Sequence, residues 1–151
     1  MIYTTYFAKL KSLPENIVPV SICGKAPAGY KGLQYKVLAP RYDFFMKWKE
    51  TQDNDYYIQC YREQVLSKLK ANDVINTLYT MSNGKDIALV CYEKPQDFCH
   101  RHIVADWLCA NGFPCDEYMY DTMYETTITD IFGNKSVIVV NKKQKSGADN
   151  I

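Results

Sequence analysis

The sequence predicts a three-layer α/β domain with a mostly parallel central sheet, and two neighbouring segments carry this prediction. Residues 86–92, DIALVCY, form an almost unbroken apolar run, which is typical of a central strand covered on both faces. Residues 99–110 follow after a short loop with an amphipathic helical pattern. A strand, a loop and a helix in this order favour a helix that packs on a parallel sheet.

Two more strands are predicted near the N-terminus. Residues 2–7 (IYTTYF) have the composition of a strand, and residues 16–22 (NIVPVSI) form a second short one after the break at Pro14. Residues 23–40 contain three glycines and are too long and too interrupted for a single element. We expect this segment to be a functional or wrapping loop.

Three helices are expected between this loop and the central strand. Their predicted ranges are 41–52, 53–70 and 72–81. The second helix has Asp53, Asn54 or Asp55 available as N-cap. Its apolar positions share one face, and Arg62 falls within the same stripe. An arginine at such a position either packs its apolar stem along the stripe with the guanidinium in water, or contacts an anion.

The C-terminal part of the chain predicts a hairpin extension. Residues 113–118 are typical of a short strand, and residues 124–140 are typical of two strands around the turn FGNK. The expected boundaries are a single domain over 1–141, with a core of about 1–118 and a hairpin extension over 119–141, and a flexible tail over 142–151.

Composition and charge exclude several classes of function. The chain has 151 residues, of which 23% are charged, and its formal net charge is +1, so nothing favours binding to nucleic acid or to a membrane surface. No apolar run approaches the length of a transmembrane helix, and the N-terminus lacks the apolar core of a signal peptide. These features favour a cytoplasmic protein, in which the six cysteines are expected to be free thiols.

Cys99, His100 and Arg101 stand in consecutive positions at the start of the predicted helix. With Asp97 as N-cap, all three would lie in the first turn, at the sheet edge where α/β proteins bind ligands. The helix dipole is positive there and disfavours cations, so His and Arg at these positions indicate an anion bound over the turn. The same surroundings predict a lowered pKa for the Cys99 thiol.

Helical angles separate the two histidines. His100 projects onto the inward face with Ile103 and Val104, whereas His102 and Asp106 lie on the side expected to face solvent. His100 is therefore the better site residue. The alternative is that His100 hydrogen-bonds to nearby backbone and only rigidifies the loop.

The segment ALVCYEKPQDFCHRHIVADWL, residues 88–108, closely resembles the signature of the domain-of-unknown-function family 488. YKGLQYKVLAP and YYIQCYREQVL resemble further segments, so the likeness covers roughly residues 1–118. It implies Rossmann-like or flavodoxin-like layering and no established activity. The polar residues to which it points are Cys91, Glu93, Lys94, Cys99, His100 and Arg101. At VSICGK, residues 20–25, the chain departs from the aspartate–valine–arginine strand end of many members.

Our first functional hypothesis is a pocket for a phosphorylated, nucleotide-like molecule at the carboxyl edge of the sheet. It would serve an enzyme, or a non-catalytic binder that sequesters a nucleotide signal, as small phage-encoded proteins can. Arg101, the helix N-terminus and Lys94 would hold the anion. The further pocket residues expected are Tyr30, Tyr35, Tyr57 and Tyr61 for stacking on a base, Lys31, Arg41 and Arg62 as secondary anion contacts, and Cys91.

The alternative hypothesis is a cysteine-dependent enzyme that acts on a nucleotide or another anionic substrate. Cys99 would be the nucleophile, His100 the base and Glu93 the acid/base partner. We expect no metal site, because the spacing of the cysteines matches no common zinc pattern, and no organic cofactor. The tyrosines and the hairpin suit a homodimer interface equally well.

Overall fold

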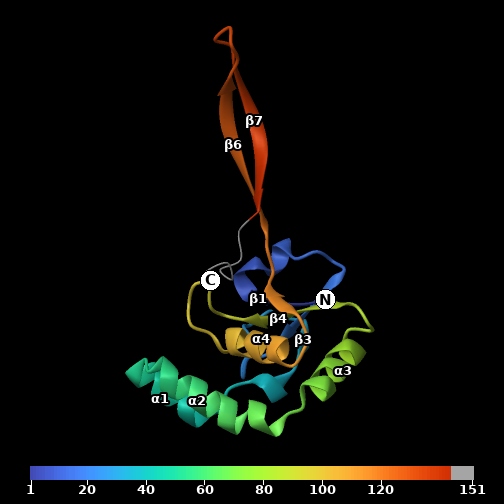
Figure 1. Ribbon diagram of the computed structural model, residues 1–151, viewed down its shortest axis with the longest axis vertical. Coiled ribbons are helices and arrows are strands. Elements are labelled where there is room, and N and C mark those ends of the chain that lie inside the picture. Colours follow the sequence, from blue (N-terminus) through green and yellow to red (C-terminus); the bar gives the residue numbers. More distant parts are fainter. Residues whose placement is uncertain (144–151) are drawn as a thin grey trace. The chain divides into compact units, whose positions relative to one another are not determined.

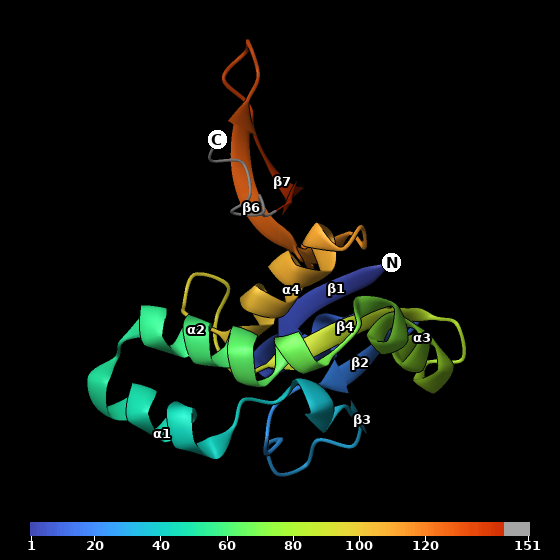
Figure 2. The ribbon, with the colours of Figure 1, turned by 60° about the horizontal axis from the view of Figure 1, so that its bottom comes forward.

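The sheet of this protein, described here from a computed structural model, has five parallel strands in the order β3-β2-β4-β1-β5 (Figure 1, Figure 2). The strands are β1 (Ile2–Tyr6), β2 (Ile17–Ser21), β3 (Leu33–Gln34), β4 (Asp86–Cys91) and β5 (Cys115–Glu117). As predicted, β4 is the central strand, and its last five residues are all buried. Because both faces of β4 are covered, the unbroken apolar run suits this position.

Helices connect the strands of residues 1–118. They are the α-helices α1 (Tyr42–Thr51), α2 (Asn54–Gln64), α3 (Ala71–Met81) and α4 (His100–Ala110), and the 3-10 helices η1 (Phe7–Ser12), η2 (Lys36–Leu38) and η3 (Leu66–Lys68). Asp53 caps α2, since its carboxylate accepts a hydrogen bond from the backbone N–H of Tyr56 at 3.1 Å. The predicted end of this helix at residue 70 is wrong, because η3 and the extended backbone of Lys70 separate α2 from α3.

The core joins three of these helices to one face of the sheet. Ile87 and Leu89 of β4 belong to the same buried cluster as Tyr61 of α2, Leu78 of α3 and Val104 of α4. Alternate residues of a strand point to opposite faces, so Ile87 and Leu89 define the face that the helices cover. The prediction of an α/β fold with a central parallel sheet is confirmed.

One local prediction about the loops is wrong. Helix α4 begins at His100 with Cys99 as its N-cap, not Asp97, because the backbone of Cys99 is still extended (φ −155°, ψ 142°). The segment 23–40, expected to be a functional or wrapping loop, also contains the short edge strand β3, in which Leu33 pairs with Val20 of β2.

The chain divides into two compact units, Met1–Tyr118 and Met119–Ile151. In the second unit β6 (Asp121–Thr129) and β7 (Lys135–Lys143) form an antiparallel hairpin, which confirms the predicted one (Figure 1). The carboxylate of Asp130 organises the turn by accepting hydrogen bonds from backbone N–H groups that follow it.

The structure describes residues 1–143, so the predicted tail lies outside the described residues from position 144 onward. Within the described part, every helix is too short or too polar to cross a bilayer.

A buried ion pair ties α4 to β5. The Arg101 side chain is fully buried, and its Nη2 and Nε donate to the two carboxylate oxygens of Glu117 at 3.0 and 3.2 Å. Its Nη1 donates to the backbone carbonyl of Glu93 at 2.6 Å. A guanidinium stays charged at physiological pH, so its burial depends on these partners. The pair therefore fixes the first turn of α4 against β5 and against the loop that follows β4.

We expect Glu117→Ala to lower the free energy of unfolding by about 3 kcal/mol or more, because it leaves a buried guanidinium without its counter-charge. The matched control is Asp86→Ala, which breaks the partly exposed ion pair with the N-terminal amine of Met1 and should cost no more than about 1 kcal/mol. Urea denaturation of both variants measures the difference. Equal losses of stability would contradict the structural role of the Arg101–Glu117 pair.

Candidate functional site

A pocket of about 520 Å³ opens at the carboxyl edge of the parallel sheet. The residues that line it are Cys23, Gly24, Lys25, Pro40, Tyr42, Phe45, Trp48, Tyr57, Cys91, Tyr92, Glu93, Phe98, Cys99 and His100. They lie at or after the ends of β2 and β4, at the start of α4 or just before it, or in α1, α2 and the segment that leads into α1. Parallel strands end together at one edge, which is where α/β folds usually place a ligand.

One wall of the pocket comes from the two strand ends. β2 is followed by Cys23, Gly24 and Lys25, and β4 ends at Cys91 and continues into Tyr92 and Glu93. The Tyr92 hydroxyl donates to the backbone carbonyl of Lys25 at 2.6 Å. This hydrogen bond links the loops that follow β2 and β4.

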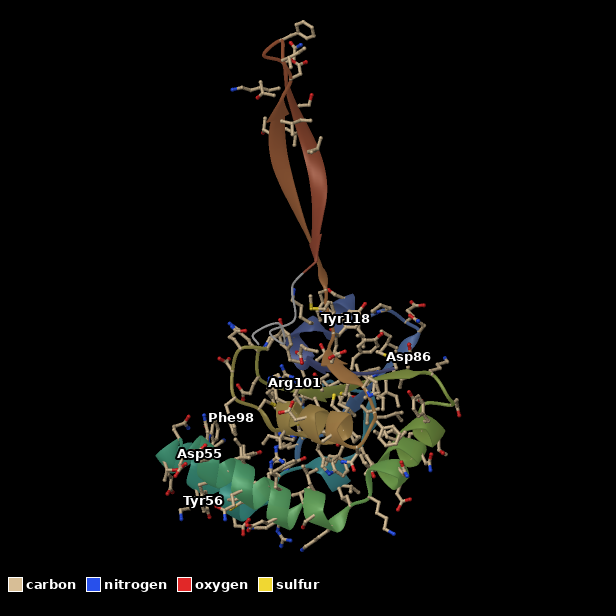
Figure 3. All side chains as sticks on the ribbon, viewed as in Figure 1. Asp55, Tyr56, Asp86, Phe98, Arg101 and Tyr118 are labelled. Atoms are coloured by element: carbon tan, nitrogen blue, oxygen red, sulfur yellow. The ribbon has the colours of Figure 1, made fainter. Side chains whose placement is uncertain are left out.

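A second wall of the pocket is aromatic. Trp48 of α1, Tyr57 of α2 and Phe98 of the loop before α4 contact one another, with ring centroids 5.1 to 5.9 Å apart. Figure 3 labels Phe98 near helices α1 and α2. The Trp48 indole N–H donates to the side-chain carbonyl of Asn54 at 2.8 Å, which fixes the orientation of that ring. The wall thus presents rings held in place by one another and by α2.

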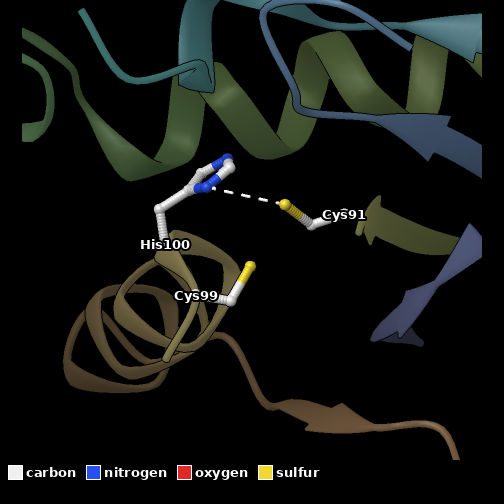
Figure 4. Close-up of side chains that lie close together, drawn as sticks. All are labelled: Cys91, Cys99 and His100. Carbon is white, nitrogen blue, oxygen red and sulfur yellow. Dashed lines mark hydrogen bonds between the residues drawn. The ribbon is translucent and has the colours of Figure 1, made fainter. Parts of the chain in front are cut away.

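The floor of the pocket holds a cluster of thiols around one imidazole (Figure 4). The Cys91 thiol donates to Nδ1 of His100 across 3.6 Å. The sulfur atoms of Cys91 and Cys99 and a ring nitrogen of His100 all lie within 4.8 Å of one another. The sulfur of Cys23 is 3.4 Å from that of Cys91. All four side chains are buried and the cysteines are free thiols.

The backbone carbonyl of Ile22 sets the tautomer of His100. It lies 2.8 Å from Nε2, and because a carbonyl oxygen can only accept, Nε2 carries the proton in neutral imidazole. Nδ1 then presents its lone pair to Cys91. This confirms the backbone hydrogen bond considered for His100, and it also equips the ring to accept a proton or a metal ion.

The predicted lowering of the Cys99 pKa is wrong. The hydrogen bond with Cys91 and burial raise the pKa of Cys99 well above its usual value, although His100 acts in the opposite direction. The hydrogen bond with Cys23 and burial likewise raise the pKa of Cys91 to about 12, against the effect of the hydrogen bond with Cys99. Burial among other thiols outweighs the helix N-terminus, so both side chains rest as neutral thiols.

Five residues singled out from the sequence line the pocket. They are Cys91, Glu93, Cys99, His100 and Tyr57. The others do not line it: Lys94, Arg101, Tyr30, Lys31, Tyr35, Arg41, Tyr61 and Arg62.

Several of these residues are occupied elsewhere. Arg101 is paired with Glu117 and bonded to the carbonyl of Glu93, so the prediction that it contacts a bound anion is wrong. The hydroxyl of Tyr30 donates to the carbonyl of Leu33, and that of Tyr61 donates to the carbonyl of Leu38. Arg62 is exposed and not in the apolar stripe, because α2 buries the face that carries Tyr57 and Tyr61.

His102 also differs from its prediction. It is half-buried rather than turned to solvent, and its Nε2 has no hydrogen-bond partner among the described residues. Burial, followed by the charge of Arg101, lowers the pKa of His102.

Sequence reasoning missed most of the aromatic wall and the end of β2. The spacing of Tyr42, Phe45 and Trp48, three residues apart along α1, places them on one side of that helix and was a usable signal. Cys23 and Lys25 lie in VSICGK, the segment noted as a departure from the common family pattern.

Comparison with known proteins shows the family of the chain. The family model DUF488-N3a, described as the active DUF488-N3 subclade, matches residues 8–112, which is more than half of the chain. Neither the curated proteins nor the solved structures provided a match. The matched range includes both strand ends of the pocket, the aromatic wall and all of α4. The chain therefore belongs to the DUF488 family.

Proposed function

We propose that the pocket binds a phosphorylated, nucleotide-like small molecule and that the protein acts chiefly as a binder of it. The observation that carries the proposal is a pocket of about 520 Å³ that aromatic rings, Lys25 and Glu93 line together. This volume lies within the range of roughly 300 to 1,000 Å³ that small-molecule sites occupy. Rings suit the base of a nucleotide, and a lysine suits its phosphate.

The aromatic wall supplies a stacking surface for a base. Trp48 and Phe98 are inclined to each other by 32°, and both remain partly accessible. Every nucleobase has a π-face, so such rings bind bases with little dependence on their identity. Glu93 lines the same pocket, and its carboxylate can accept hydrogen bonds from the amino or imino groups of a base.

The pocket wall that follows β2 supplies the anion contact that Arg101 cannot make. Lys25 is the cationic side chain among the lining residues described, and it follows β2 directly after Gly24. The N-terminus of α4 lies at the same pocket through Cys99 and His100. A helix N-terminus and a lysine both favour a phosphate group.

We expect Lys25→Gln to weaken binding of a nucleoside monophosphate about tenfold and to leave binding of the matching nucleoside unchanged, because only the phosphate contact is lost. Calorimetric titration with the four ribonucleoside 5′-monophosphates and their nucleosides measures both effects. Lys94→Gln, an exposed lysine that does not line the pocket, is the control and should bind like the wild type. Equal losses in both variants would contradict the assignment of Lys25.

We expect Trp48→Leu to weaken binding of the nucleoside and of the monophosphate alike, by roughly 5- to 150-fold, because stacking on a base contributes about 1–3 kcal/mol. Trp107→Leu is the matched control, since Trp107 is also a partly buried tryptophan packed against the core but does not line the pocket. The same titrations report the result. Absence of binding for every nucleotide tested would overturn the proposed function.

A thiol-dependent enzyme acting on a nucleotide or another anionic substrate is the second candidate. The observation that favours it is the chain of contacts from the Cys91 thiol to His100 Nδ1 and from His100 Nε2 to the Ile22 carbonyl. A nucleophile, a base and a group that orients the base are the usual components of such a site. Because Cys91 is the thiol that contacts His100 Nδ1, this candidate takes Cys91 as the nucleophile in place of Cys99. The description of the matching subclade as active favours the same candidate.

The enzyme candidate predicts that His100→Gln slows alkylation of Cys91 by iodoacetamide about tenfold or more, because the base that takes the thiol proton is lost. Mass spectrometry of chelator-treated protein at neutral pH gives the rate at each site. Cys115 is a buried thiol outside the cluster and serves as the internal control. An unchanged rate at Cys91 would remove this candidate and leave the binding pocket.

A further inference from the structure

We propose that Cys91, Cys99 and His100 form a site for a zinc ion with two thiolates and one imidazole as ligands. The fourth coordination position would be open to the pocket. The inference does not depend on the proposed nucleotide ligand, because it rests on side chains of the pocket floor alone.

The first argument is the separation of the ligand atoms. Zinc binds sulfur at about 2.3 Å and imidazole nitrogen at about 2.0–2.1 Å, so at a tetrahedral angle the two ligands lie about 3.5–3.6 Å apart. The sulfur of Cys91 and Nδ1 of His100 are 3.6 Å apart. Cys99 completes a set whose ligand atoms lie within 4.8 Å of one another, so its sulfur would have to move by at most about 1.3 Å to reach these separations.

The second argument is the orientation of the imidazole. A histidine that binds zinc through one nitrogen usually donates the other N–H to a backbone carbonyl or carboxylate, which fixes the ring. His100 makes this arrangement with Ile22, at 2.8 Å from Nε2. Its Nδ1 therefore offers a lone pair to the sulfur cluster, as a ligand must.

The third argument is the surroundings of the cluster. The three side chains are each only 5% exposed, so a bound ion would be shielded from water on the protein side. All three also line the pocket, so one side of the ion would face the cavity. Structural zinc sites close all four positions with protein ligands, whereas three protein ligands with an open fourth position are typical of sites that act on a bound molecule.

The spacing in sequence gave no sign of this site. Seven residues separate Cys91 from Cys99, and His100 follows at once, which matches no common zinc pattern. The fold creates the cluster, because Cys91 ends the central strand and Cys99 and His100 begin the helix that returns over it. Adjacent residues of a helix point about 100° apart, and Cys99 reaches the cluster because it is the N-cap, where the backbone is still extended.

Binding releases protons in a fixed ratio. Cys91 and Cys99 are neutral thiols in the metal-free protein, because hydrogen bonds with other thiols and burial raise their pKa values, and zinc binds the thiolate. Zinc therefore displaces one proton from Cys91 and one from Cys99, while His100 coordinates through the lone pair of Nδ1 and releases none. No electron transfer takes place, and the net charge of the site does not change, because the two positive charges of the ion replace those of the two protons.

The test is titration of the chelator-treated, reduced full chain with zinc(II), and with cobalt(II) as a spectroscopic probe. We expect one metal ion per chain, about two protons released per ion at pH 7, and a cobalt spectrum with sulfur-to-metal charge transfer and tetrahedral bands. Cys91→Ser, Cys99→Ser and His100→Gln should each weaken zinc binding by ~100-fold or more. Thermal unfolding of the metal-free variants shows that each is folded before it is titrated.

Cys115→Ser is the matched control, because Cys115 is as deeply buried, at 4% exposed, but belongs to β5 and not to the cluster. It should bind zinc as the wild type does. Equal weakening by Cys115→Ser, or the absence of stoichiometric binding by the wild type, would overturn the site. Cys23→Ser should leave binding intact, and loss of the ion in this variant would overturn the open fourth position by showing that Cys23 fills it.

Discussion

The hydrogen bond between His100 Nε2 and the carbonyl of Ile22 is the contact on which the rest of the site depends. Ile22 also donates its backbone N–H to the carbonyl of Val90 at 3.1 Å, so one residue joins the ends of β2 and β4 to the first turn of α4. The ring is held from one side by this carbonyl and faces Cys91 with its other nitrogen. Without the carbonyl, neither the tautomer nor the direction of the imidazole would be fixed.

The three consecutive residues at the start of α4 take three different directions. Cys99 joins the buried thiols, His100 reaches the end of β2, and Arg101 turns to Glu117 of β5. Successive residues of a helix diverge by about 100°, so such a tripeptide can connect a helix to three neighbours at once. The ion pair anchors one side of the turn, and the imidazole anchors the other. The first turn is therefore rigid where it meets the pocket.

The sequence predicted the parts of the site that depend on one strand and the helix after it. The apolar run of β4 followed by α4 was enough to place Cys91 and His100 at the same sheet edge. The predicted anion contact of Arg101 was wrong, because periodicity gives the direction of a side chain but not its partner. The partner, Glu117, lies close to Arg101 because β5 pairs with β1 in the sheet, and this pairing could not be read from the sequence. Trp48 was missed for the same reason, since the position of α1 depends on contacts distant in sequence. The pKa of Cys99 depended on the hydrogen bond with Cys91 and on burial, neither of which the local sequence pattern reveals.

The most direct test of this account is to determine which ring nitrogen of each histidine carries a proton. NMR measures this from the chemical shifts of the imidazole nitrogens in the metal-free protein at neutral pH. The chain contains two histidines, so His102 provides the internal comparison. The account predicts that His100 is a single tautomer with its proton on Nε2, bound to the Ile22 carbonyl, and with Nδ1 unprotonated towards Cys91. A proton on Nδ1, or rapid exchange between the two tautomers, would contradict it.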